Sequence, residues 1–125
     1  MIVGIGLDIA EVDRIDAAIA RHGERFLDRV YTPAERHYCD SKPNRMERFA
    51  GRFAAKEAAM KAIGTGWKRG VAWRDFEVSR LPSGQPVIEF HGKAAEFAAA
   101  LGVRRALVTI SHTAEQAIAQ VILEN

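Results

Sequence analysis

With 125 residues, 48% of them hydrophobic, the chain can build one hydrophobic core but not two, so we expect a single domain over residues 1–125. Its net charge is only +2, and no segment resembles an acidic tail or an arginine-rich arm. Its single cysteine excludes an internal disulfide and a thiolate metal cluster. No segment resembles a signal peptide or approaches the roughly 18 apolar residues of a membrane span, so the sequence predicts a soluble cytoplasmic protein with no membrane partner.

The first predicted element is a short strand over residues 2–9, which is rich in β-branched side chains and carries Asp8 near its end. Its two glycines indicate that another element packs closely against its backbone. A helix is expected from residue 11 to about residue 22, because apolar side chains recur there at helical spacing and Gly23 would end it. Three arginines share roughly one side of this region: Arg14, Arg21 and Arg25.

The next helix has a clear start signal. Thr32 is placed to act as the N-cap, Pro33 occupies the first helical position, and Glu35 at the third position completes a capping box. This helix should run to about Cys39. A polar break over residues 40–44 separates it from the following helix.

A long helix is predicted from about residue 45 to residue 63, and it is apolar around its whole circumference except for a few charges. Such a helix is usually buried, and an unpartnered carboxylate there costs several kcal/mol unless a metal ion or a cationic neighbour offsets the cost. Glu57 and Lys61 lie one turn apart at the edge of the bulky stripe, while Arg52 and Lys56 flank its other side. The alternative is a plain ion pair between Glu57 and Lys61, which would contribute about 0.3–0.5 kcal/mol.

The second half of the chain changes character after a glycine-containing loop that starts at Gly64. The elements predicted there are strands at 76–78 and 87–90, a helix at 93–101, and strands at 106–111 and 117–123. Helices thus dominate the first half and antiparallel strands the second. The pattern predicts an α+β fold in which the long buried helix packs with antiparallel strands.

Two segments together resemble the signature of the 4'-phosphopantetheinyl transferase family: Gly-Ile-Gly-Leu-Asp-Ile at residues 4–9, and Gly-Arg-Phe-Ala-Ala-Lys-Glu-Ala at residues 51–58 followed by Lys61. In length and layout the whole chain is similar to the small bacterial members. The resemblance implies the fold of that family. It also implies transfer of the phosphopantetheine arm of coenzyme A to a serine of apo acyl carrier protein, with release of 3',5'-ADP, dependence on Mg²⁺ and a role in fatty acid biosynthesis.

In this resemblance Asp8 and Glu57 match the catalytic acids that bind the metal, and Lys61 matches a catalytic lysine beside the phosphates. A hard divalent cation held by one or two carboxylates suits a diphosphate substrate. Because the two acids are almost fifty residues apart, they can meet only if the first strand lies against the long helix. Two candidates for the general base that removes the serine proton are Glu57 itself and a metal-bound water.

The resemblance also implies contacts with the coenzyme and the carrier. The expected coenzyme contacts are Arg45, Arg52, Lys56, Lys61, Gly64, Ser111, His112 and Thr113. Each has an alternative explanation. The arginines and lysines could simply be solvated, Gly64 could only end the helix, and His112 could be an ordinary residue of a hairpin bend. Acyl carrier proteins are acidic, so the arginine row at positions 14, 21 and 25 would dock one. Residues 14–61 carry eleven Lys/Arg against seven Asp/Glu, a local charge of +4.

Longer relatives in the family join two copies of this unit, so a single copy is expected to associate. The resemblance implies a homotrimer with active sites between neighbours. Two other functions are compatible with parts of the sequence. A basic module binding nucleic acid or an acidic protein is disfavoured, because aromatic residues make up 8% of the chain and do not alternate with basic ones. A metal-dependent pyrophosphatase could use the same two acids, but it would not explain the arginine row or the extended motif around Glu57.

Overall fold

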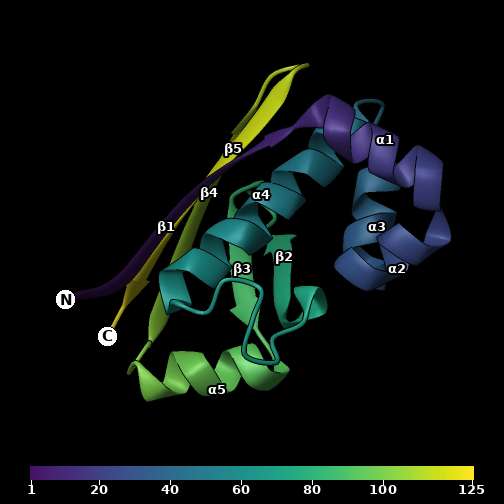
Figure 1. Cartoon of the computed structure of the whole chain (residues 1–125). Coiled ribbons are helices and arrows are strands. Elements are labelled where there is room, and N and C mark those ends of the chain that lie inside the picture. Colours follow the sequence, from purple (N-terminus) through teal and green to yellow (C-terminus); the bar gives the residue numbers. More distant parts are fainter.

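The computed structural model describes all residues, 1–125, and has the expected α+β architecture (Figure 1). The elements in chain order are β1 (Ile2–Glu11), α1 (Val12–His22), α2 (Glu24–Val30), α3 (Pro33–Asp40), α4 (Arg45–Ile63), the 3₁₀ helix η1 (Trp73–Asp75), β2 (Phe76–Arg80), β3 (Pro86–Phe90), α5 (Gly92–Ala100), β4 (Arg105–His112) and β5 (Gln116–Glu124). None of the helices combines the length and the apolar character needed to cross a membrane.

The strands form two antiparallel sheets. One has the order β1-β5-β4, and the other is the β2-β3 hairpin. Figure 1 shows α4 lying across the three-stranded sheet, with α1, α2 and α3 grouped beside one end of α4 and α5 near its other end. The two termini lie side by side, and the backbone N–H of Asn125 donates to the carbonyl of Met1. The first and last strands are thus neighbours in the sheet.

Helix α4 is buried on nearly all sides, as its sequence predicts. Phe49 and the alanines at positions 50, 54, 55, 58 and 59 have no exposed surface. The same helix buries two cationic side chains, Arg52 and Lys56. Their burial requires specific partners, because an unpaired charge in a core is strongly unfavourable.

The backbone of β1 packs directly on the backbone of α4. A Cβ built on Gly4 would lie 2.2 Å from the carbonyl oxygen of Ala62, and one built on Gly6 would lie 1.8 Å from that of Ala58. Only residues without a side chain fit here, so the expectation of close packing at the strand glycines is confirmed. This contact sets Asp8 beside the turn of α4 that carries Glu57 and Lys61.

The helix boundaries follow the predicted caps, with one addition. The capping box of α3 is present, because the Glu35 N–H donates to Thr32 Oγ1 and the Thr32 N–H donates to Glu35 Oε1. Helix α2 was not predicted. Gly23, with φ of 54°, ends α1 as expected, but the chain re-enters a helix at once, so the same residue precedes the seven residues of α2.

The face of the three-stranded sheet that points away from α4 carries large apolar side chains. Ile5, Leu7 and Ile9 of β1 are 50–58% exposed, and Ile118 of β5, paired in register with Ile9, is 39% exposed. We call this set of four residues the outer sheet face. Contiguous exposed apolar side chains of this kind mark an interaction surface.

We predict that Gly6→Ala destabilises the protein by about 1–3 kcal/mol or more, because the added methyl group meets a backbone oxygen that cannot move aside. Thermal unfolding monitored by circular dichroism measures the change. Gly51→Ala is the matched control, since its new Cβ would meet only the Ile110 side chain, at 3.0 Å, and alanine favours the helix interior by about 0.5–1 kcal/mol. Equal unfolding temperatures for the two variants would contradict the packing argument.

Candidate active site

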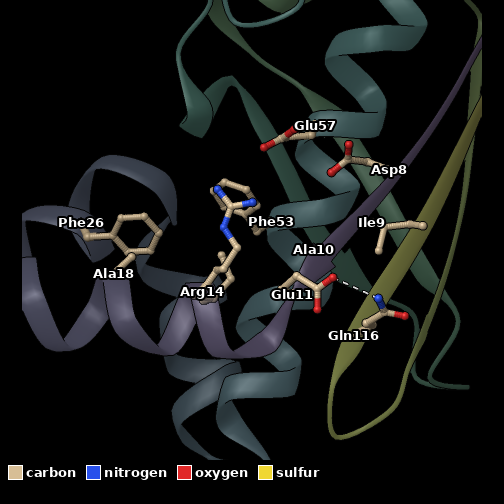
Figure 2. Close-up of a pocket in the computed structure, with 11 residues that line it drawn as sticks. Asp8, Ile9, Ala10, Glu11, Arg14, Ala18, Phe26, Phe53, Glu57 and Gln116 are labelled. Atoms are coloured by element: carbon tan, nitrogen blue, oxygen red, sulfur yellow. Dashed lines mark hydrogen bonds between the residues drawn. The ribbon is translucent and has the colours of Figure 1, made fainter.

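A pocket of about 650 Å³ opens between β1, α1, α2 and α4 (Figure 2). Its polar end is formed by Asp8, Glu11, Arg14 and Glu57, and its apolar end by Ile15, Ala18, Phe26 and Phe53. Figure 2 shows the Asp8 and Glu57 carboxyl groups beside each other, one from the strand and one from the helix. The pocket therefore joins a charged end to an apolar one.

The two acids interact electrostatically. Burial raises the pKa of Glu57, and the negative charge of Asp8 and a hydrogen bond with its carboxyl group raise it further, against the opposing charges of Lys61 and Arg14. Two carboxylates held this close repel each other unless a cation or a shared proton lies between them. The condition inferred from the sequence, that the first strand lies against the long helix, is met.

Lys61 binds Asp8 rather than Glu57. Its Nζ lies 2.8 Å from Asp8 Oδ1 and donates to the backbone carbonyl of Leu7 at 2.9 Å. The alternative ion pair between Glu57 and Lys61 along the helix is not among the salt bridges of the structure. Asp8, Glu57 and Lys61 thus form one cluster at the polar end of the pocket.

The cluster has the donors that a hard divalent cation requires. Mg²⁺ prefers carboxylate oxygens, usually one or two, together with phosphate oxygens and water. Asp8 and Glu57 supply two such groups, they are partly buried, and their mutual repulsion would be relieved by a dication. These residues fit Mg²⁺.

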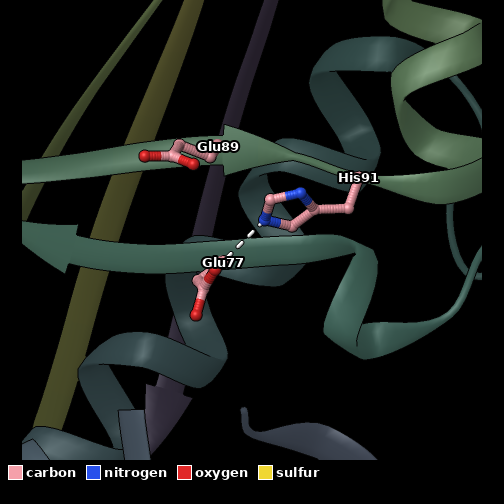
Figure 3. Close-up of side chains that lie close together, drawn as sticks. All are labelled: Glu77, Glu89 and His91. Atoms are coloured by element: carbon pink, nitrogen blue, oxygen red, sulfur yellow. Dashed lines mark hydrogen bonds and ion pairs between the residues drawn. The ribbon is translucent and has the colours of Figure 1, made fainter. Parts of the chain in front are cut away.

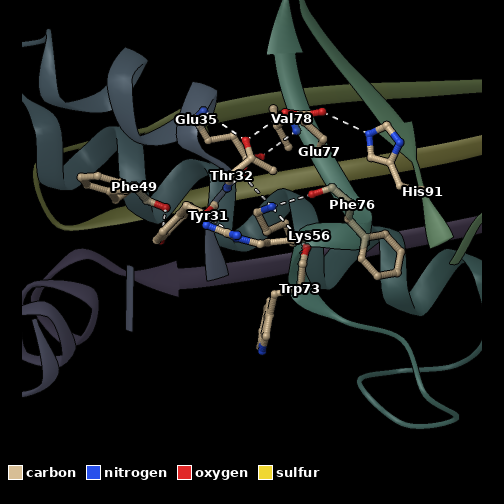
Figure 4. A network of polar contacts seen from close by, with 11 residues as sticks. Tyr31, Thr32, Glu35, Phe49, Lys56, Trp73, Phe76, Glu77, Val78 and His91 are labelled. Atoms are coloured by element: carbon tan, nitrogen blue, oxygen red, sulfur yellow. Dashed lines mark hydrogen bonds and ion pairs between the residues drawn. The ribbon is translucent and has the colours of Figure 1, made fainter. Parts of the chain in front are cut away.

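Lys56 is not available to the coenzyme, and its predicted contact is corrected. The side chain is fully buried, and its Nζ lies 2.8 Å from Glu35 Oε1 (Figure 4). It also donates to the backbone carbonyls of Phe76 and Trp73. Burial lowers the pKa of Lys56, and the Glu35 carboxylate opposes that shift. Sequence spacing does not reveal this partner, which lies 21 positions upstream on another helix.

Arg52 and Arg45 lie outside the lining of the pocket. Arg52 is 5% exposed, its guanidinium carbon lies 4.2 Å from the centroid of the Tyr38 ring, and its Nε has no hydrogen-bond partner. Arg45 forms an ion pair with Asp40 at 2.9 Å and lies over the Phe49 ring. Neither arginine is brought to Asp8 and Glu57 within one chain.

The segment Ser111–Thr113 lines a smaller hollow of about 140 Å³ on the side of the outer sheet face. His112 Nδ1 lies 2.8 Å from Glu47 Oε1. Ile9 and Gln116 border both this hollow and the larger pocket, so the two are adjacent. Gly64 caps α4 with φ of 81°, which is the ordinary role of a glycine at a helix end.

The arginine row divides between the pocket and the surface. All three arginines are exposed, but only Arg14 also lines the pocket near Glu57. The apolar pocket residues were not predicted as part of a site. Phe53 precedes Glu57 by one helical turn, which was an available signal, but Phe26 lies on the unpredicted helix α2.

A second group of ionisable side chains lies on the β2-β3 hairpin, where Glu77 and Glu89 are cross-strand partners and His91 is close to both (Figure 3). His91 Nε2 lies 3.1 Å from Glu77 Oε1, and Thr32 Oγ1 donates to Glu77 Oε2. These contacts orient Glu77. The group shares no residue with the pocket that contains Asp8 and Glu57.

Comparison with known proteins agrees with the resemblance. The sequence pattern of the 4'-phosphopantetheinyl transferase superfamily matches residues 4–121. Proteins named holo-[acyl-carrier-protein] synthase from Koribacter versatilis and Solibacter usitatus are 62% and 56% identical, each over 125 residues and 100% of both chains.

Solved structures give the same result for the fold. Holo-[acyl-carrier-protein] synthase from Neisseria meningitidis superposes with a TM-score of 0.89 at 32% identity over 100% of both chains. The Helicobacter pylori protein of the same name, solved in complex with coenzyme A, has a TM-score of 0.84 at 32% identity and covers 96% of this chain and 99% of its own.

We predict that Mg²⁺ raises the unfolding temperature of the wild-type chain, because the ion binds the folded acid pair and not the unfolded chain. The stabilisation should approach about 2.7 kcal/mol at 100 times the Kd. Calorimetry with and without EDTA measures it. Asp8→Asn and Glu57→Gln should lose the response, whereas Glu115→Gln, an exposed acid outside the pocket, should keep it. An unchanged response in Asp8→Asn and Glu57→Gln would place the ion elsewhere.

Proposed function

This chain belongs to the 4'-phosphopantetheinyl transferase superfamily, and we propose that it transfers the phosphopantetheine arm of coenzyme A to a serine of apo acyl carrier protein, in support of fatty acid biosynthesis. The observation that carries the proposal is the cluster of Asp8, Glu57 and Lys61. The two acids line the charged end of the pocket, and Lys61 forms an ion pair with Asp8. The whole chain would act as one transferase domain, since its buried apolar residues form a single cluster.

The reaction forms a bond between the serine oxygen and the phosphorus of the arm and breaks the diphosphate, so 3',5'-ADP leaves and the serine loses a proton. Asp8 and Glu57 would hold Mg²⁺, which when bound neutralises charge on the diphosphate. Lys61 would offset the charge on the departing nucleotide, since reactions of phosphates depend mainly on positioning and charge stabilisation. Glu57, which lines the pocket, is the proposed proton acceptor.

The acidic carrier would dock on α1 and α2. Arg21 and Arg25 are exposed there, and Arg14 joins that surface to the pocket. Such charges mainly steer association, so docking should weaken with salt. The apolar end of the pocket, next to Arg14, suits the arm or an apolar side chain of the carrier.

No nucleic-acid partner is proposed, and a cytoplasmic location fits the buried free thiol of Cys39.

We further propose that the chain is a homotrimer with active sites between neighbours. The support is the outer sheet face, which leaves four large apolar side chains in water in a single chain. The remaining coenzyme contacts would then come partly from a neighbour, because several predicted residues do not reach their own chain's pocket: Arg45, Arg52, Ser111, His112 and Thr113. Lys61 and Gly64 would contact the coenzyme from the chain that supplies Asp8 and Glu57.

The decisive experiment mixes the protein with apo carrier protein, coenzyme A and Mg²⁺ and follows the mass of the carrier. We predict attachment of one phosphopantetheine, loss of the reaction with EDTA, and a decrease in kcat of about 100-fold or more in Asp8→Ala and Glu57→Ala. An exposed-acid variant, Glu115→Ala, should keep its activity. No mass change with several apo carriers would defeat the proposal.

We also predict that Leu7→Arg converts the assembly to monomers and lowers transfer, because a charge on the outer sheet face cannot be buried against a second copy. Light scattering after gel filtration measures the mass of the assembly. Leu81→Arg is the matched control, since Leu81 has similar exposure, at 48%, but lies at the end of the β2-β3 hairpin. A wild-type monomer, or an unchanged assembly in Leu7→Arg, would contradict this proposal.

A further inference from the structure

The buried Lys56 ammonium joins three elements to α4 (Figure 4). Its three acceptors are Glu35 Oε1 of α3, the carbonyl of Trp73 in η1 and the carbonyl of Phe76 at the start of β2. An ammonium group has three N–H donors, so all of them have a partner within the protein. Lys56 therefore has no donor left for a reactant, although it directly precedes Glu57.

Glu35 is held as firmly as Lys56. Its Oε1 accepts from the Thr32 N–H and its Oε2 from the Val78 N–H, both at 2.7 Å, and the residue is 2% exposed. A buried ion pair is weak evidence for stability, because apolar residues of similar size often serve the core equally well. The pair does fix the relative positions of α3, α4, η1 and β2.

The 3₁₀ helix η1, which this pair holds, lies behind the pocket wall rather than in its lining. Residues 64–72 form the loop that connects α4 to Trp73, and all three glycines of this loop have positive φ. The Trp73 ring stacks on Phe53 at 4.8 Å, and Phe53 lines the pocket together with Glu57. Lys56 thus contacts the Trp73 carbonyl while the Trp73 ring supports Phe53.

We propose that Lys56 is a positioning residue for the transfer reaction: by binding the Trp73 and Phe76 carbonyls it holds Trp73 against Phe53 and so fixes the pocket wall beside Glu57. This role rests on the proposed function, but it requires no contact between Lys56 and any reactant. Asp8, Glu57 and Lys61 would keep their places without it. Loss of Lys56 should therefore weaken binding in the pocket more than it slows the chemical step.

The test uses Lys56→Met combined with Glu35→Gln, so that no buried charge is left without a partner. Glutamine retains an oxygen that can accept from Thr32 or Val78, whereas the two carbonyls lose their donor. We expect the KM for coenzyme A or for the carrier to rise about tenfold or more, with kcat within about threefold of wild type. Val121→Ala, a buried truncation on β5 outside the network, controls for lost stability. Unchanged KM values, or an equal rise in Val121→Ala, would overturn the proposal.

A second measurement, of Trp73 fluorescence, does not depend on enzymatic activity. The chain has two tryptophans, so Trp67→Phe leaves Trp73 as the only fluorescent indole. We expect acrylamide to quench Trp73 at least twofold more efficiently in the Lys56→Met/Glu35→Gln background than with Lys56 and Glu35 intact, and unchanged quenching would contradict the positioning role. Absence of transfer by the wild-type enzyme would instead refute the proposed function and leave this measurement valid.

Discussion

The arrangement of the site depends on the contact between the backbone of β1 and the backbone of α4. Gly4 and Gly6 present no side chain to the helix, and Ala58 and Ala62 present carbonyl oxygens where a Cβ would otherwise lie. Small residues on both elements add little apolar area each, but they set how closely the two elements approach. Asp8, two residues after Gly6, is thereby held beside the turn of α4 that carries Glu57 and Lys61.

The charges on α4 then serve different purposes according to the face from which they project. Lys56 points into the core, where Glu35 and two carbonyls satisfy it. Glu57 points into the pocket with the repelling carboxylate of Asp8. Lys61 is half exposed at the helix end, where its single carboxylate partner leaves it free to turn toward a bound anion. One helix can thus support the fold and the site because its faces meet different neighbours.

The sequence indicated local features well. The capping box at Thr32 and Glu35 depends on residues three positions apart. The composition of each element indicated the burial of α4 and the close packing at the strand glycines, although not their partners, and the two-segment signature identified the family. The side-chain partners that join different helices and strands could not be predicted from the sequence. Nothing in the spacing shows that Lys56 pairs with Glu35, or that Lys61 prefers Asp8 to Glu57, because those partners are set by how helices and strands dock. Helix α2 was missed because a glycine that ends one helix can also begin the next.

Strand β1 and helix α4 place two acids, Asp8 and Glu57, where both can bind one divalent ion. Crystals soaked with Mn²⁺ and 3',5'-ADP would test it directly, since anomalous scattering locates the metal without reference to activity. We expect an anomalous peak within bonding distance of carboxylate oxygens of both Asp8 and Glu57. A peak bound by neither acid, or one bound only by the Glu77, Glu89 and His91 group, would contradict it.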